Sequence, residues 1–124
     1  MIEKNKTILV IEDEILLRSL MRKGLEKKGF NVLEAVNGCD GVDIFEKEKP
    51  SLVVTDMLMP DKEGMQTIQE LRQIDPNVKI VAMSGGGSTK NMAFLEMAER
   101  VGASATIAKP FKPQDLFNII EGLL

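Results

Sequence analysis

Histidine, tryptophan and tyrosine are absent from this chain of 124 residues, and cysteine occurs once. Without histidine, the chain has no Ser-His-Asp or Cys-His catalytic group, no imidazole metal ligand and no phosphohistidine of its own. A single cysteine permits neither an internal disulfide nor a thiolate metal cluster, which fits a reducing compartment. We therefore expect a cytoplasmic protein.

Charge and hydropathy exclude further classes. The 16 basic and 19 acidic residues give a net charge of −3, which does not support binding to nucleic acid, because such proteins usually show a basic excess or stripe. No apolar run approaches the roughly 20 residues that span a bilayer, and the run Ile8–Ile11 is too short for a signal peptide. With 44% hydrophobic residues, the whole chain, 1–124, is expected to form one globular domain that needs no membrane.

Short β-branched runs alternate with stretches of helical period along the chain. This alternation predicts five βα units and a parallel sheet, and the two strongest runs have the unbroken apolar character of strands buried on both faces. The expected strands are Thr7–Ile11, Asn31–Val36, Ser51–Thr55, Lys79–Met83 and Ser104–Ala108. The expected helices are Glu14–Lys28, Gly38–Glu48, Gly64–Ile74, Thr89–Val101 and Pro113–Leu124.

Spacing within the first helix predicts which side chains face the core. At about 100° per residue, one face collects apolar groups: Leu17, Leu20, Met21 and the aliphatic stem of Lys28. On the opposite face, the i, i+4 spacing predicts two ion pairs, Glu14–Arg18 and Arg22–Glu26. Elsewhere we expect Met65, Met83 and Met97 to fill gaps in the core and Cys39 to be buried and inert.

Polar side chains follow four of the five predicted strands. They are Glu12, Asp13, Asp56, Ser84 and Lys109, and they should meet because ligands of open α/β sheets bind beyond the carboxyl ends of the strands. Three adjacent carboxylates repel one another, and a divalent cation relieves that repulsion. Oxygen ligands without histidine or cysteine suit Mg²⁺, which keeps several waters and binds phosphates. A carboxylate can attack phosphorus while an ammonium and a hydroxyl bind the phosphoryl oxygens, so the set indicates Mg²⁺-assisted phosphoryl transfer to an aspartate.

Five short motifs stand in order at the predicted strand ends. They are Ile11–Glu14, Val54–Met57 with Met59 and Pro60, Gly64, Ala82–Gly85, and Lys109–Phe111. Each motif is weak alone, but the ordered set is specific, and through it the whole chain resembles a receiver domain of a two-component response regulator, of the stand-alone, chemotaxis-regulator type. The resemblance implies a flavodoxin-like (βα)₅ fold, a three-layer α/β sandwich with a parallel sheet in the order 2-1-3-4-5, and no output domain.

The resemblance also implies a role for each residue that handles the phosphoryl group. Asp56 is the expected phosphoacceptor. Ser84 corresponds to the switch hydroxyl, and Lys109 to the amine that neutralises charge on the phosphoryl group. The peptide bond before Pro110 is expected to be cis.

The expected cofactor is Mg²⁺. By the same resemblance, Asp13 and Asp56 bind the ion directly, the backbone carbonyl of Leu58 supplies a further ligand, and Glu12 acts through water.

Partners follow from the resemblance as well. A histidine kinase or a histidine phosphotransfer protein should supply the phosphoryl group, and a downstream protein should bind a surface around helix 4, strand 5 and helix 5. Ile15 lies about 160° from the core face of the first helix, and Phe117 lies off the core face of the last, so both are candidate partner contacts. Thr106 stands three residues before the lysine, where many family members carry an aromatic switch residue, so switching should run through helix 4. We expect a monomer or a weak dimer.

Two alternatives stay open. A small phosphatase with an aspartyl nucleophile typically uses two aspartates spaced D-x-D, and Asp56-Met57-Leu58 lacks the second one. A degenerate receiver could act as a scaffold, but the complete acidic pair, acceptor and lysine argue against it. We expect the domain to catalyse only its own phosphorylation and dephosphorylation, and therefore not to be an enzyme toward other molecules.

Overall fold

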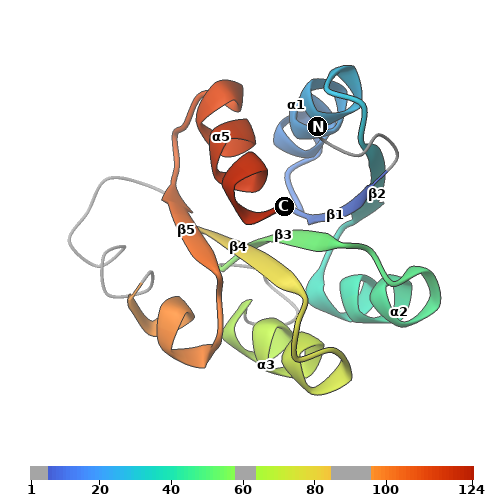
Figure 1. The fold of residues 1–124 in the computed structure, drawn as a ribbon, viewed down its shortest axis with the longest axis vertical. Helices are drawn as coiled ribbons and strands as arrows, with labels where there is room; N and C mark the ends of the chain where they lie inside the picture. Colours follow the sequence, from blue (N-terminus) through green and yellow to red (C-terminus); the bar gives the residue numbers. More distant parts are fainter. Residues whose placement is uncertain (1–5, 58–63, 85–95) are drawn as a thin grey trace.

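The computed structural model describes residues 6–57, 64–84 and 96–124 of the chain (Figure 1). Its strands are β1 (Thr7–Ile11), β2 (Asn31–Ala35), β3 (Leu52–Asp56), β4 (Lys79–Ser84) and β5 (Ala105–Ala108). Its helices are α1 (Ile15–Lys27), α2 (Gly38–Glu48), α3 (Gly64–Ile74) and α5 (Pro113–Leu123), and residues 96–101 are helical as well. The expected helix Thr89–Val101 is thus helical from residue 96, and its residues 89–95 lie outside the described ranges.

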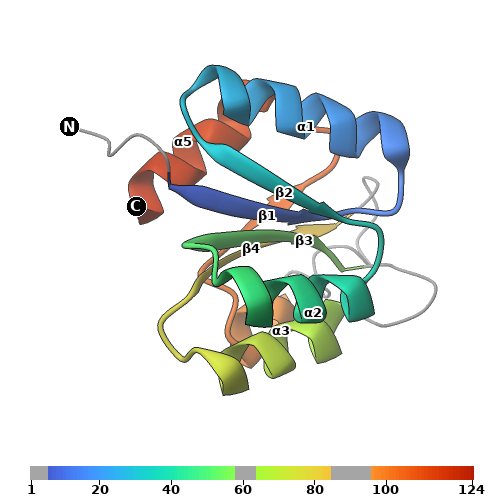
Figure 2. The same cartoon turned by 90° about the vertical axis from the view of Figure 1, so that its right-hand side faces the viewer.

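The five strands form one parallel sheet in the order β2-β1-β3-β4-β5. Helices α1 and α5 cover one face of this sheet, and α2 and α3 cover the other (Figure 2). These three layers confirm the predicted flavodoxin-like fold. The chain runs from β1 outward to β2 and then returns to place β3 on the other side of β1, so the crevice between the ends of β1 and β3 is the topological switch point where such sheets bind ligands.

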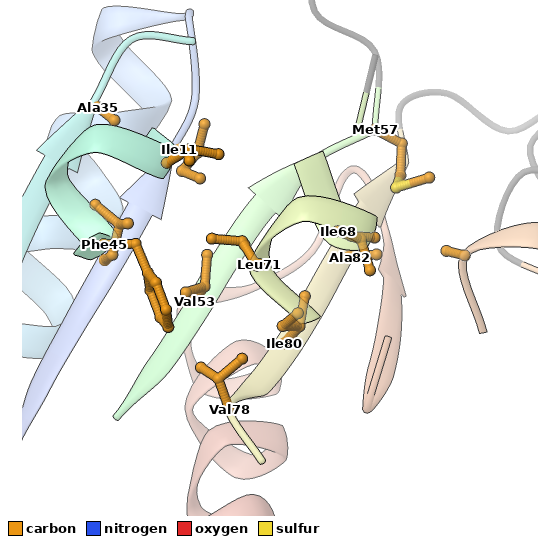
Figure 3. Close-up of a cluster of buried hydrophobic side chains, with 13 residues drawn as sticks. Ile11, Ala35, Phe45, Val53, Met57, Ile68, Leu71, Val78, Ile80 and Ala82 are labelled. Atoms are coloured by element: carbon orange, nitrogen blue, oxygen red, sulfur yellow. The ribbon is translucent and has the colours of Figure 1, made fainter. Parts of the chain in front are cut away.

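Two hydrophobic cores lie on the two faces of the sheet. Successive residues of a strand point to opposite faces, so in β1 Ile8 and Val10 pack under α1 and α5, whereas Leu9 and Ile11 pack under α2 and α3. Figure 3 shows the second of these cores. Because both faces are covered, the central strands are apolar without a break, which is the pattern that the sequence shows.

Gly64 lets α3 begin directly against the end of β3. A Cβ atom at this position would lie 2.5 Å from the Met57 Cα and 2.7 Å from the Asp56 carbonyl oxygen. The Gly64 amide also donates to the Met57 carbonyl oxygen at 3.2 Å. This close backbone contact holds α3 beside the strand end that carries Asp56.

Several individual core predictions were wrong. Leu20 is 61% exposed, because the buried face of α1 is centred on Met21 and Leu25 and Leu20 lies beyond its edge. Met97 and Cys39 are exposed as well. Among the described residues, no helix is both long enough and apolar enough to cross a membrane.

Candidate functional site

Three carboxylates meet where β1 and β3 end. Glu12 and Asp13 directly follow β1, and Asp56 is the last residue of β3. Since the neighbouring strands pair Ile11 with Thr55, both strands end at the same level. One carboxylate oxygen from each of the three acidic residues lies within 4.8 Å of the others, so the structure brings the predicted acidic residues together at the switch point.

Lys109 reaches the same place from β5. Its Nζ donates to Glu12 Oε1 at 2.7 Å and to Asp56 Oδ2 at 3.0 Å. Its backbone amide donates to the Ser84 carbonyl oxygen at 2.7 Å, which fixes the turn after β5 to the end of β4. The Lys109–Pro110 peptide bond is cis, as predicted.

Burial and ion pairing shift the pKa of Glu12 and of Lys109. Burial raises the pKa of Glu12, although hydrogen bonds from Lys109 and from the Glu14 amide partly offset this shift. Burial alone would lower the pKa of Lys109, but its hydrogen bonds to Glu12 and Asp56 outweigh that effect and the pKa is raised. Lys109 is therefore a firmly protonated ammonium, and it neutralises only part of the charge of three clustered carboxylates.

The donor set fits Mg²⁺. All three side chains offer carboxylate oxygens, the hard ligands that this ion prefers. Glu12 and Asp56 are buried whereas Asp13 is exposed, so the cluster faces solvent on one side, as suits an ion that keeps several waters. The carbonyl of Leu58, the fourth expected ligand, lies outside the described residues.

Ser84 adds a hydroxyl at the end of β4. The Met57 amide donates to the Met83 carbonyl oxygen at 2.8 Å, which holds this end of β4 against the residue after Asp56. Ser84 is fully buried, and within the described part of the chain its Oγ has no hydrogen-bond partner. A buried hydroxyl without a partner is unusual in a folded protein, and a bound ligand is one physical reason to retain it.

Sequence spacing predicted the wrong partner for Arg18. The predicted pair Arg22–Glu26 is present at 3.1 Å. Arg18, however, pairs with Glu34 of β2, with 3.1 Å between Nε and Oε1, instead of with Glu14, the N-cap residue of α1. Its Nη1 also donates to the Glu12 carbonyl oxygen at 2.9 Å. The sequence does contain the true partner, Glu34. However, Glu34 lies on a strand, and the spacing of residues within one helix cannot show that Arg18 reaches it.

At the start of α1, apolar side chains next to the acidic cluster are exposed. Ile15 is 67% exposed and Leu16 is 72% exposed. Leu16 and Leu20 line a groove that extends to Lys109, Pro110 and Phe111 at the edge of the site. The predicted contact residue Ile15 is therefore accessible beside the site.

The two remaining predicted positions lie away from the carboxylates. Thr106 is half-buried in β5, paired with Ala82 of β4. Phe117 is half-buried on α5, with its ring centre 6.3 Å from that of Phe30 and 4.6 Å from the Lys28 Nζ. Phe117 thus has a packing role, and its contact with a partner stays a prediction.

Comparisons with known proteins agree on one family. The family model of the response regulator receiver domain matches residues 8–121. Sporulation initiation phosphotransferase F of Bacillus subtilis is 28% identical over 120 residues, covering 97% of this chain and 94% of that protein. Chemotaxis protein CheY of Thermotoga maritima is 34% identical over 119 residues, covering 95% of this chain and 94% of that protein.

Solved structures resemble the fold closely. A CheY-like receiver domain protein from Methanospirillum hungatei superposes with a TM-score of 0.85 at 30% identity, covering 97% of this chain and 94% of that one. NtrX from Brucella abortus superposes with a TM-score of 0.90 at 28% identity, but the chain spans only 27% of its length.

Proposed function

The chain belongs to the family of response regulator receiver domains of two-component signalling, and from this premise we propose that it accepts a phosphoryl group on Asp56 in a Mg²⁺-dependent reaction. One observation carries the proposal: the Lys109 ammonium lies between Glu12 and Asp56, at hydrogen-bond distance from both. This arrangement supports the proposal because the Asp56 carboxylate lies beside a fixed positive charge and two further acidic groups.

The proposed reaction is a displacement at phosphorus. A carboxylate oxygen of Asp56 forms the new bond to phosphorus while the bond from phosphorus to the donor's imidazole nitrogen breaks, and the imidazole leaves with the donor. Lys109 and the Ser84 hydroxyl would bind the phosphoryl oxygens as charge moves onto them. Asp13 and Asp56, with Glu12 through water and the carbonyl of Leu58, would hold Mg²⁺, which when bound supplies positive charge to those oxygens.

A phosphohistidine that donates the group must lie outside this sequence, because the sequence has no histidine. We propose a histidine kinase or a histidine phosphotransfer protein in the cytoplasm, docked on the exposed apolar residues of α1. The accessibility of Ile15, Leu16 and Leu20 beside the acidic cluster supports this placement. A downstream protein would then bind the surface around helix 4, β5 and α5, where Thr106 replaces the usual aromatic residue. The domain itself would act on no other substrate and exist as a monomer or a weak dimer.

Acetyl phosphate, a small phosphodonor, tests the acceptor without knowledge of the partner. Incubated with Mg²⁺, the wild-type protein should gain one phosphoryl group by intact mass, and Asp56→Asn should gain none. Asp43→Asn, an exposed aspartate on α2, is the matched control and should behave as wild type. Phosphorylation of Asp56→Asn to the wild-type extent, or of wild type equally well after chelation of Mg²⁺, would contradict the proposal.

A further inference from the structure

Arg18 connects three elements beside the acidic cluster. From α1, its Nε pairs with Glu34 Oε1 on β2 at 3.1 Å, and its Nη1 donates to the Glu12 carbonyl oxygen, after β1, at 2.9 Å. The Arg18 side chain is only 13% exposed, so solvent screens these contacts less than it would on an open surface. The guanidinium suits this task because its donors lie in a fixed plane and can serve two acceptors at once.

The geometry of α1 and β2 explains how the Arg18 side chain contacts both Glu34 and the segment before α1. Helical side chains tilt toward the N-terminus of their helix, so Arg18 covers the preceding turn and the segment that leads into α1. Glu34 shares a face of β2 with Val32, which packs in the core under α1. The carboxylate of Glu34 therefore lies on the side of the sheet from which Arg18 approaches.

The Glu12 backbone is held from both sides. Its N–H donates to the Ala35 carbonyl oxygen of β2 at 3.0 Å, and its carbonyl accepts from Arg18. The next residue is Asp13, and the two carboxylates are two of the three in the cluster. Both acidic side chains thus extend from a backbone segment that Arg18 and β2 fix in place.

We propose that Arg18, oriented by Glu34, is a positioning residue that holds Glu12 and Asp13 in the geometry that binds a divalent cation. The proposal rests on the proposed function in one respect, the binding of Mg²⁺ by this cluster. At the cluster, Arg18 donates to the backbone carbonyl of Glu12 and not to its carboxylate. Arg18 therefore acts on the positions of the metal ligands.

Electrostatics alone predicts the opposite change in Mg²⁺ affinity when Arg18 is replaced. A guanidinium near a cation site repels the cation, so removal of its charge should tighten Mg²⁺ binding. Loss of a positioning contact should weaken binding, since residues that orient metal ligands typically change affinity by about 10- to 100-fold. A residue that only stabilised the fold would leave the affinity of the folded protein unchanged.

Isothermal titration with Mg²⁺ distinguishes these accounts. Arg18→Met keeps most of the aliphatic stem and removes every donor, and it should bind Mg²⁺ about tenfold more weakly than wild type. Arg22→Met is the matched control, because Arg22 pairs with the same Glu34 at 2.6 Å and with Glu26 but makes no hydrogen bond to Glu12 within the described part of the chain. Its affinity should stay within about twofold of wild type.

Backbone NMR provides a readout without metal. The Asp13 amide belongs to the peptide whose carbonyl Arg18 binds, so its ¹⁵N resonance should move in Arg18→Met and stay in place in Arg22→Met. Should Arg18→Met not fold, Arg18→Lys replaces it. This variant keeps the charge but loses the planar guanidinium that serves Glu34 and the Glu12 carbonyl together, so weaker Mg²⁺ binding than wild type is again expected.

The outcomes separate the two proposals. If wild type binds Mg²⁺ and the Arg18 variant binds it equally well or more tightly, or if the Asp13 amide does not move, the positioning role is wrong and the proposed function stands. If wild type itself binds no Mg²⁺, the proposed function fails and the positioning role fails with it.

Discussion

Ser84, the last residue of β4, and Ser104, just before β5, differ in whether their hydroxyl groups form hydrogen bonds. Ser84 is fully buried, with no partner for its Oγ in the described ranges. The Ser104 Oγ accepts from the Ile80 amide at 3.0 Å and from the Arg72 Nη2 at 3.2 Å. Folding therefore uses the Ser104 hydroxyl, whereas the Ser84 hydroxyl makes no hydrogen bond within the described part of the chain.

Ser84→Ala should not lower the free energy of unfolding, and should raise it by up to about 1 kcal/mol, because it removes a buried hydroxyl that has no partner among the described residues. The same variant should accumulate less phosphoprotein from acetyl phosphate, since a donor to the phosphoryl group is lost. Ser104→Ala is the control and should lose about 1 kcal/mol, because it removes the acceptor of the Ile80 amide. Urea unfolding measures the first effect, and a larger loss in Ser84→Ala than in Ser104→Ala would contradict the account.

Residues that follow strand ends were predictable, and Arg18 was not. Glu12, Asp56 and Lys109 could be assigned because parallel strands bring their carboxyl ends to one edge, whatever their separation in sequence. Arg18 has two acidic candidates, Glu14 just before its own helix and Glu34 on β2. Only the packing of α1 on the sheet decides between them, and that packing is not visible in the spacing of one helix.

Helix faces were predicted less well than helix positions. The boundaries of α2 and α3 agree with the sequence prediction at both ends, because each helix begins at a glycine and ends two residues before a proline. The buried face of α1 was placed too far toward Leu20, because Leu25, which is buried, was not counted. This difference between the predicted and observed buried face of α1 does not move the helix. It does change which apolar residues are accessible to solvent and to partners.

Gly64→Ala should destabilise the protein, by about 1–3 kcal/mol, because its Cβ would overlap the backbone of β3 at Met57 and Asp56. Gly122→Ala is the matched control on α5, where a Cβ would meet no atom of the described residues within 4 Å. Its greater helix propensity should leave stability unchanged or raise it by up to about 1 kcal/mol. Thermal and urea unfolding of both variants provide the check, and equal effects at the two glycines would contradict the described packing.

At the scale of the whole molecule, the order of the strands is what assembles the site. Periodicity predicted parallel strands but could not say which are neighbours. The order 2-1-3-4-5 followed from the motifs and the family they resemble. That order puts β1 beside β3, so that Asp56 meets Glu12 and Asp13 although more than 40 residues separate it from that pair in sequence.

Mg²⁺ should stabilise the whole fold, because the native cluster binds the ion far better than an unfolded chain does. At a Mg²⁺ concentration about 100 times the dissociation constant, the gain is about 2.7 kcal/mol. Asp13→Asn should lose most of this gain, while its stability without Mg²⁺ stays equal or rises, because one of three repelling carboxylates is gone. Melting curves with Mg²⁺ and with a chelator measure both quantities, and an equal shift in wild type and Asp13→Asn would contradict the assignment of the cluster.

The central claim is that Asp56 carries the phosphoryl group, and chemical trapping tests it most directly. Borohydride reduces an acyl phosphate to an alcohol, so treatment of the phosphorylated protein followed by peptide mass spectrometry marks the modified residue. After incubation with acetyl phosphate and Mg²⁺, we predict reduction at residue 56 and at no other acidic residue of the cluster. Reduction at Glu12 or Asp13 instead, or no reduced residue in protein shown by intact mass to be phosphorylated, would contradict the account.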